Sequence, residues 1–99
     1  MKALQNQSLT IKADDLPENA NYGTLLRILL KPVQNQSYDL SDIESRLRIG
    51  KVLDTITGNE DIQLEDSDTK YLQNLVKGYR WGIIHQDILD FSNAIAALK

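Results

Sequence analysis

The sequence predicts a mostly α-helical protein, a single domain of four helices with a small two-stranded β element. In four separate segments, apolar residues recur at the three- and four-residue spacing of an amphipathic helix. Turn or capping residues precede each of these segments. Two much shorter segments instead alternate apolar and polar residues, which is the spacing of a strand.

The first segments of the chain are polar and then alternating. Residues 1–7 contain few apolar side chains, so we expect a disordered tail there. Leu9 and Ile11 then lie on one face of a short predicted strand, and Ile62 and Leu64 repeat that pattern. We therefore expect the segments Leu9–Ile11 and Ile62–Leu64 to pair as a ribbon that packs against a helix, because an isolated ribbon is only marginally stable.

The segment 22–30 is the most densely apolar part of the chain, with Arg27 as its only charge. A helix that is apolar on most of its circumference is normally buried, so this segment is predicted to form the centre of the core. Asn21 is a candidate N-cap, and Thr24 is the alternative if the helix begins later. Pro32 disfavours helical geometry at the residue before it and so ends the helix.

A second helix is predicted from Ser41, which forms a capping box with Glu44, to about Thr57, where a Gly-Asn pair follows. Its apolar arc is wider than a surface helix requires. Gly50 lies inside that arc, although glycine in a helix interior costs about 1 kcal/mol relative to alanine. We therefore predict that another backbone packs closely against Gly50. The helix at 22–30 is the candidate within the chain, and a second chain is the alternative.

Two more helices follow. The third has N-cap candidates at 66–68 and is predicted to stop between Tyr79 and Gly82. The fourth is capped or begun by Asp87, and it carries an apolar face from Ile88 to Leu98. With no linker or internal repeat, residues 1–99 are predicted to form one domain.

Composition excludes several functional classes. The net charge of −3 argues against a general nucleic-acid binder, which needs a positive field. The absence of cysteine excludes a disulfide framework and a thiolate site, and it favours a cytoplasmic setting. No apolar run approaches the length of a membrane span.

No motif in the sequence indicates catalysis, a cofactor or a metal. The acidic residues at 60–68 lack the spacing and central glycine of a calcium loop. His85 is the only histidine, and we expect it to cap a helix or contact backbone rather than act as a base. None of the glycines forms a phosphate-binding loop. The sequence therefore predicts a protein that is not an enzyme and needs no cofactor.

A basic cluster on the second helix offers a nucleic-acid alternative. Arg46, Arg48 and Lys51 would contact phosphates if the chain were a small nucleic-acid-binding regulator. Glu44 shares one polar stripe of the helix with Arg48 and Lys51, which favours a solvated helix face instead. Because Arg46 falls inside the apolar arc, it either extends along the apolar surface to reach water or pairs with an acid, and we favour the former.

Two sets of residues are predicted to bind a protein partner. Tyr79, Arg80 and Trp81 are of the residue types that dominate interface hot spots, although Trp81 would alternatively fold over the core as a lid. The second set is the apolar surface in excess of what one small core hides, which would mark a subunit contact. It comprises Ile28, Leu30, Ile49 and Val52.

The layout from Tyr38 to Leu98 resembles small uncharacterised bacteriophage-encoded proteins. The residues that carry the resemblance are the capped helix at 41–57 with Arg46-Leu47-Arg48, the run 62–66 leading into a helix, Trp81, and a last helix around Phe91. The resemblance implies a structural, assembly or host-interaction role in the host cytoplasm or the virion. The sequence thus predicts a non-enzymatic protein–protein interaction module that binds a partner or itself as a homo-oligomer.

Overall fold

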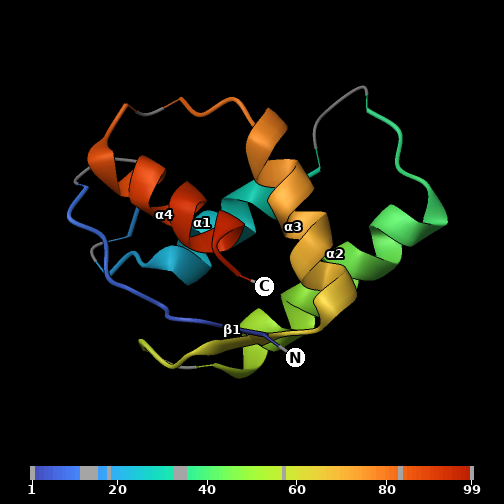
Figure 1. Ribbon diagram of the computed structural model, residues 1–99, viewed down its shortest axis with the longest axis horizontal. Coiled ribbons are helices and arrows are strands. Elements are labelled where there is room, and N and C mark those ends of the chain that lie inside the picture. The colour runs from blue at the N-terminus through green and yellow to red at the C-terminus, as the bar shows by residue number, and fades with distance from the viewer. Residues whose placement is uncertain are drawn as a thin grey trace.

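The computed structural model describes residues 2–11, 16–17, 19–32, 36–56, 58–82 and 84–98. Within these ranges the chain forms four helices and a two-stranded antiparallel sheet, which confirms the predicted fold class. The elements in order are β1 (Lys2–Leu4), α1 (Tyr22–Leu30), α2 (Leu40–Thr55), β2 (Ile62–Leu64), α3 (Asp66–Gly78) and α4 (Gln86–Ala96). Figure 1 shows α3 and α4 in front of α1, with the β ribbon along the lower edge of the molecule.

The sheet uses a different N-terminal segment from the predicted one. Lys2, rather than a residue near Leu9, pairs with Leu64, and the ladder continues to Leu4 opposite Ile62. The prediction of a strand at Leu9–Ile11 is therefore wrong. The Leu9 N–H instead donates to the carbonyl oxygen of Ala20 at 2.9 Å, which holds this segment beside the start of α1.

The predicted disordered tail is also corrected for residues 2–7; Met1 lies outside the described residues. Leu4 is buried against the apolar side of β2. Asn6 is only 2% exposed. Its Oδ1 accepts from the Gly23 N–H at 2.8 Å, and its Nδ2 donates to the Gly58 carbonyl at 3.0 Å. The N-terminal segment is thus fixed by burial and by buried polar contacts, neither of which local composition reveals.

Helix α1 has the predicted bounds and the predicted central position. Asn21 is its N-cap, and its side chain accepts from the Thr24 N–H at 3.1 Å. The Thr24 hydroxyl in return accepts from the Asn21 N–H, so the two alternative caps form one reciprocal capping box. Leu25, Leu26 and Leu29 are almost fully buried and form the middle of the core.

Helix α2 begins at Leu40, one residue before the predicted start. Asp39 and Asp42, rather than Ser41 and Glu44, form its capping box, and the Asp42 N–H donates to Asp39 Oδ1 at 2.8 Å. A carboxylate at Asp39 serves the free N–H groups as well as a hydroxyl would. The helix ends at Thr55, and Thr57, the predicted end, lies outside the described residues.

The N-terminal ends of α3 and α4 are capped differently. Glu65 occupies the N-cap position of α3 without a side-chain hydrogen bond, and the helix ends at Gly78, just before the predicted stop. His85 is the N-cap of α4, where its Nδ1 accepts from the Asp87 N–H at 3.0 Å. The prediction that His85 caps a helix or contacts backbone is confirmed.

Gly50 does not lie against another helix. Helices α1 and α2 do pack on each other, but a Cβ placed on Gly50 would meet no heavy atom of the described residues within 4 Å. The prediction of a close approach at Gly50 within the chain is therefore wrong. The helix-propensity cost of about 1 kcal/mol relative to alanine is left without a compensating contact inside the described part of the molecule.

Candidate functional site

The apolar residues predicted to form a subunit contact lie mainly on the inward side of their helices. Ile49 is 0% exposed and belongs to the core, so it offers no surface to a partner. Ile28, Leu30 and Val52 are half-buried and pack against that core. Their role in a subunit contact stays a prediction, and the area they present is small.

The largest apolar exposure on a single helix occurs instead on the opposite side of α2. Leu40 is 77% exposed, Ile43 41% and Leu47 62%. At about 100° per residue these three side chains fall within a 60° arc, on three successive turns of the helix. We call this set, Leu40, Ile43 and Leu47, the outer face of α2. It points away from the side that buries Ile49 and Leu53.

The sequence indicates an excess of apolar surface on α2 and predicts it at Ile49 and Val52, whereas Ile49 is buried and the most exposed apolar side chains of α2 are Leu40, Ile43 and Leu47. The error came from the polar stripe, which was expected to mark the solvent side. Arg48 belongs to that stripe, yet it packs towards α3, so the direction of the core had to be known before the exposed half was assigned.

Trp81 lies at the edge of the core. Its ring centroid is 5.9 Å from that of Phe91 in an edge-to-face arrangement, and 4.6 Å from that of Tyr79. Such contacts favour burial of most of an aromatic ring. Trp81 is half-buried and packs against the core, which is the lid alternative that the sequence left open.

Tyr79 and Arg80 contribute to a cleft of about 510 Å³ between the ends of α1 and α3 and the start of α2. Lys31, Arg46 and Arg80 line it, and the described lining residues include no acid. A positive cleft on a chain of net charge −3 offers a place for a carboxylate or phosphate group. Arg80 is the exposed member of the predicted partner-binding triplet.

Arg46 joins three helices rather than reaching freely into solvent. Its NH1 donates to the carbonyl oxygen of Leu30 at the C-terminal end of α1, at 2.8 Å. Its Nε donates to the Tyr71 hydroxyl of α3 at 2.8 Å, and its guanidinium lies 4.5 Å from the ring centroid of Tyr38. A cation at a helix C-terminus also opposes the negative end of the helix dipole. Neither alternative offered by the sequence, extension into water or pairing with an acid, describes this arrangement.

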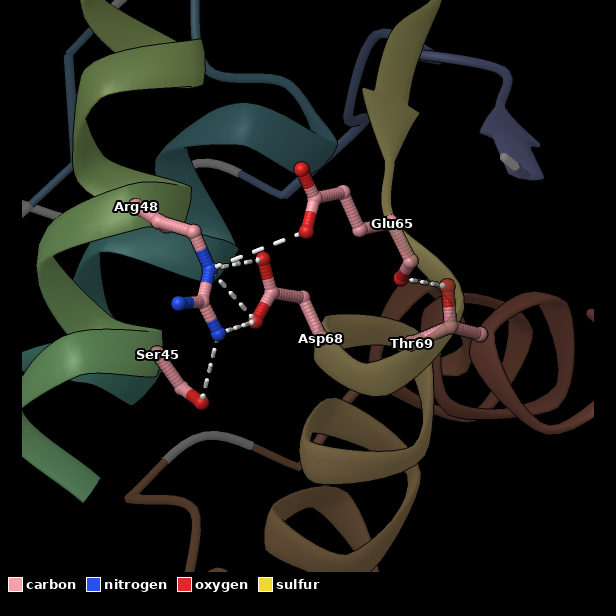
Figure 2. Close-up of polar contacts among 5 residues, drawn as sticks. All are labelled: Ser45, Arg48, Glu65, Asp68 and Thr69. Carbon is pink, nitrogen blue, oxygen red and sulfur yellow. Dashed lines mark hydrogen bonds and ion pairs between the residues drawn. The ribbon is translucent and has the colours of Figure 1, made fainter. Parts of the chain in front are cut away.

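Arg48 forms an ion pair across the α2–α3 interface (Figure 2). Its NH2 lies 2.8 Å from Asp68 Oδ1, and its Nε lies 3.0 Å from Asp68 Oδ2. The Asp68 side chain is 4% exposed, whereas that of Arg48 is 42% exposed. The hydrogen bond and negative charge of Asp68 raise the pKa of Arg48. Asp68, expected among the N-cap candidates, instead provides a buried carboxylate that ties α3 to α2.

The basic cluster that carried the nucleic-acid alternative is thus divided. Arg46 and Arg48 are engaged in contacts within the chain, while Lys51 is exposed. A phosphate-binding face needs several cations that point to the same side. The structure does not bring these three side chains together as such a face, so it adds no support to a nucleic-acid interface at α2.

No family model, curated protein or solved structure matches this chain. Over the described ranges, no group of three or more histidine, aspartate or glutamate side chains is placed to hold a metal ion. The described helices include none with the length and apolar character needed to span a membrane. The outer face of α2 and the positive cleft are two surfaces of the described molecule on which a function can be argued.

Proposed function

We propose that this chain is a non-enzymatic protein–protein interaction module whose binding surface is the outer face of α2. The observation that carries the proposal is the exposure of Leu40, Ile43 and Leu47 on three successive helical turns. Contiguous exposed apolar side chains rimmed by polar residues are typical of protein interaction sites. Apolar anchors at this spacing are also how one helix docks onto another protein.

The proposal depends on these side chains being clustered. Ile84 and Leu89 are also exposed, at 104% and 59%, but they lie outside α2, and scattered apolar residues are ordinary on a protein surface. The core is filled by other residues, including the fully buried Leu26, Ile49 and Phe91. The outer face of α2 therefore contributes little to the fold and is available to a partner.

The resemblance to small bacteriophage-encoded proteins narrows the role that we propose. A structural, assembly or host-interaction protein acts by binding other chains, and it requires a surface of the kind that α2 presents. The support for this narrower role is the layout from Tyr38 to Leu98 in the sequence.

A matched pair of substitutions tests the proposed surface. Leu47→Glu places a charge on the outer face of α2, and Leu89→Glu places the same charge on a leucine of α4 with nearly equal exposure, 59% against 62%. Each tagged variant is isolated under native conditions from the cells in which the chain is made, and the associated proteins, including untagged copies of the chain, are quantified.

We expect the wild type and Leu89→Glu to retain the same associated chains, and Leu47→Glu to lose them at least tenfold. Circular dichroism of both variants checks that each is folded. Equal association by all three proteins would show that the outer face of α2 is not the binding surface.

A further inference from the structure

Gly50 continues the outer face of α2 towards the C-terminal end of the helix. Residues 40, 43, 47 and 50 are spaced by three, four and three positions, which is the a/d repeat of helices that pair along their length. At about 100° per residue these four positions lie within an 80° arc. The glycine that has no close contact among the described residues thus belongs to the same stripe as the three exposed apolar side chains.

A glycine on an exposed helical stripe allows another backbone to approach closely, because it has no side chain to hold the two apart. The described part of the chain does not use this space. A helix that used it would therefore belong to a second molecule.

We propose that α2 pairs with the α2 helix of a second copy of this chain, in antiparallel orientation, about a two-fold axis midway between residues 47 and 48. This inference rests on the proposed function of the outer face and names its partner. About this axis, Gly50 of one copy comes level with the gap between Ile43 and Leu47 of the other. Each glycine therefore receives apolar side chains from the facing helix.

Asp54, which is paired with Arg27, ends the apolar run of the stripe after Gly50, whereas two charges on its flank favour this arrangement. Glu44 and Lys51 are exposed on the same flank of the outer face and lie equally far from the proposed axis. In the antiparallel pair, Glu44 of each copy faces Lys51 of the other, which gives two opposite-charge contacts. A parallel pair would place this flank of the two copies on opposite sides of the interface, so neither opposite-charge contact between Glu44 and Lys51 would form.

The size of the surface limits the strength of the pair. Stable dimers commonly bury about 1,200–2,000 Å² in total, and an interface built from three large side chains per copy falls below that range, among the weak and transient contacts. We therefore expect a dimer that forms as the protein concentration rises and that is weakened by substitution of any one of these side chains.

Gly50→Ala gives the sharpest test, because a contact between copies predicts that the monomer becomes more stable while the dimer becomes weaker. The new methyl group meets no described atom of its own chain and removes the poor helix propensity of glycine, so the melting temperature of dilute monomer should rise by about 4–8 °C. The same methyl group would separate the two backbones, so the dissociation constant measured by sedimentation velocity should rise at least tenfold.

Charge reversal tests the orientation. Glu44→Lys and Lys51→Glu should each weaken the dimer, and the double variant should restore it, because both contacts regain opposite charges. Leu89→Glu should leave the dissociation constant unchanged. Absence of restoration in the double variant would overturn the antiparallel arrangement.

A wild-type protein that stays monomeric from micromolar to millimolar concentration would overturn self-pairing, as would a dimer unaffected by both Gly50→Ala and Leu47→Glu. These failures are distinguishable from failure of the proposed function. If the monomer retains a different protein from cells and Leu47→Glu abolishes that association, the outer face binds a partner other than a second copy.

Discussion

Asn6 offers a direct test of the argument that the N-terminal segment is part of the fold. The Asn6 side chain is buried and bridges two distant parts of the chain. It accepts a hydrogen bond from the Gly23 N–H, one of the backbone groups in the first turn of α1 that have no partner within the helix. It also donates to the Gly58 carbonyl, which accepts a second hydrogen bond from Asn21.

The cost of Asn6→Ala can be worked from these contacts. The Gly23 N–H would be left buried without its acceptor, which costs about 1–3 kcal/mol. Loss of the bond to Gly58 adds about 0.5–1.5 kcal/mol, at the lower end because Asn21 still occupies that carbonyl. We therefore expect the free energy of unfolding to fall by about 2–4 kcal/mol, a large part of the 5–15 kcal/mol of a typical domain.

Urea denaturation followed by circular dichroism measures this change. Gln7→Ala is the matched control, because Gln7 is exposed and its truncation should change the unfolding free energy by less than about 0.5 kcal/mol. A disordered tail would give equally small effects for both variants. If Asn6→Ala also costs less than about 0.5 kcal/mol, the assignment of residues 2–7 to the fold is refuted.

Asp87→Asn should lower the free energy of unfolding by an amount that depends on pH. Burial alone raises the pKa of Asp87, but hydrogen bonds from the backbone and hydroxyl of Thr10 outweigh this effect and lower the pKa below its ordinary value. The stabilisation by the ionised Asp87 carboxylate is full above the unfolded pKa of about 4 and is lost as the pH falls through the lower folded pKa. The difference in urea midpoint between wild type and variant should therefore disappear over that pH range. A difference that stays constant with pH would contradict the lowered pKa of Asp87. Adding Asp68→Ala to Arg48→Ala should cause no further loss in urea midpoint, because Arg48→Ala already leaves a buried carboxylate without its cation. Additive losses in this double-mutant cycle would show that the pair is not coupled. Trp81→Ala should lower the free energy of unfolding by about 2 kcal/mol, which is less than the loss on truncating a fully buried tryptophan, and should leave the sedimentation coefficient unchanged. A change in association without loss of stability would show that Trp81 belongs to an interface.

Local patterns were sufficient for the helices. The density of apolar residues at 22–30, together with Asn21 and Thr24 on one side and Pro32 on the other, predicted α1 with its observed bounds. The start of α2 differed by one residue, because several polar residues near Asp39 can serve as caps and only the backbone conformation selects one of them. Helix existence depends on spacing along the chain, which is visible in the sequence.

The sheet could not be predicted in the same way. Leu9–Ile11 has a clearer alternation than Lys2–Leu4, yet the latter pairs with β2. Pairing depends on which segment reaches β2 with an apolar side chain turned to the core, and Leu4 meets that condition. The Leu9 segment is held instead by Ala20 and by the Asp87 carboxylate, both far along the chain from β2.

The candidate site could be predicted from the sequence only in part. The sequence alone shows that α2 carries more apolar surface than one helix face can bury, and that a glycine interrupts it at position 50. The packing of α2 against its neighbours then shows that Ile49 and Leu53 face the core while Leu40, Ile43 and Leu47 face outward. The physical reason is that helical periodicity fixes the angles between side chains on one helix, whereas the direction of the core is set by the neighbouring elements.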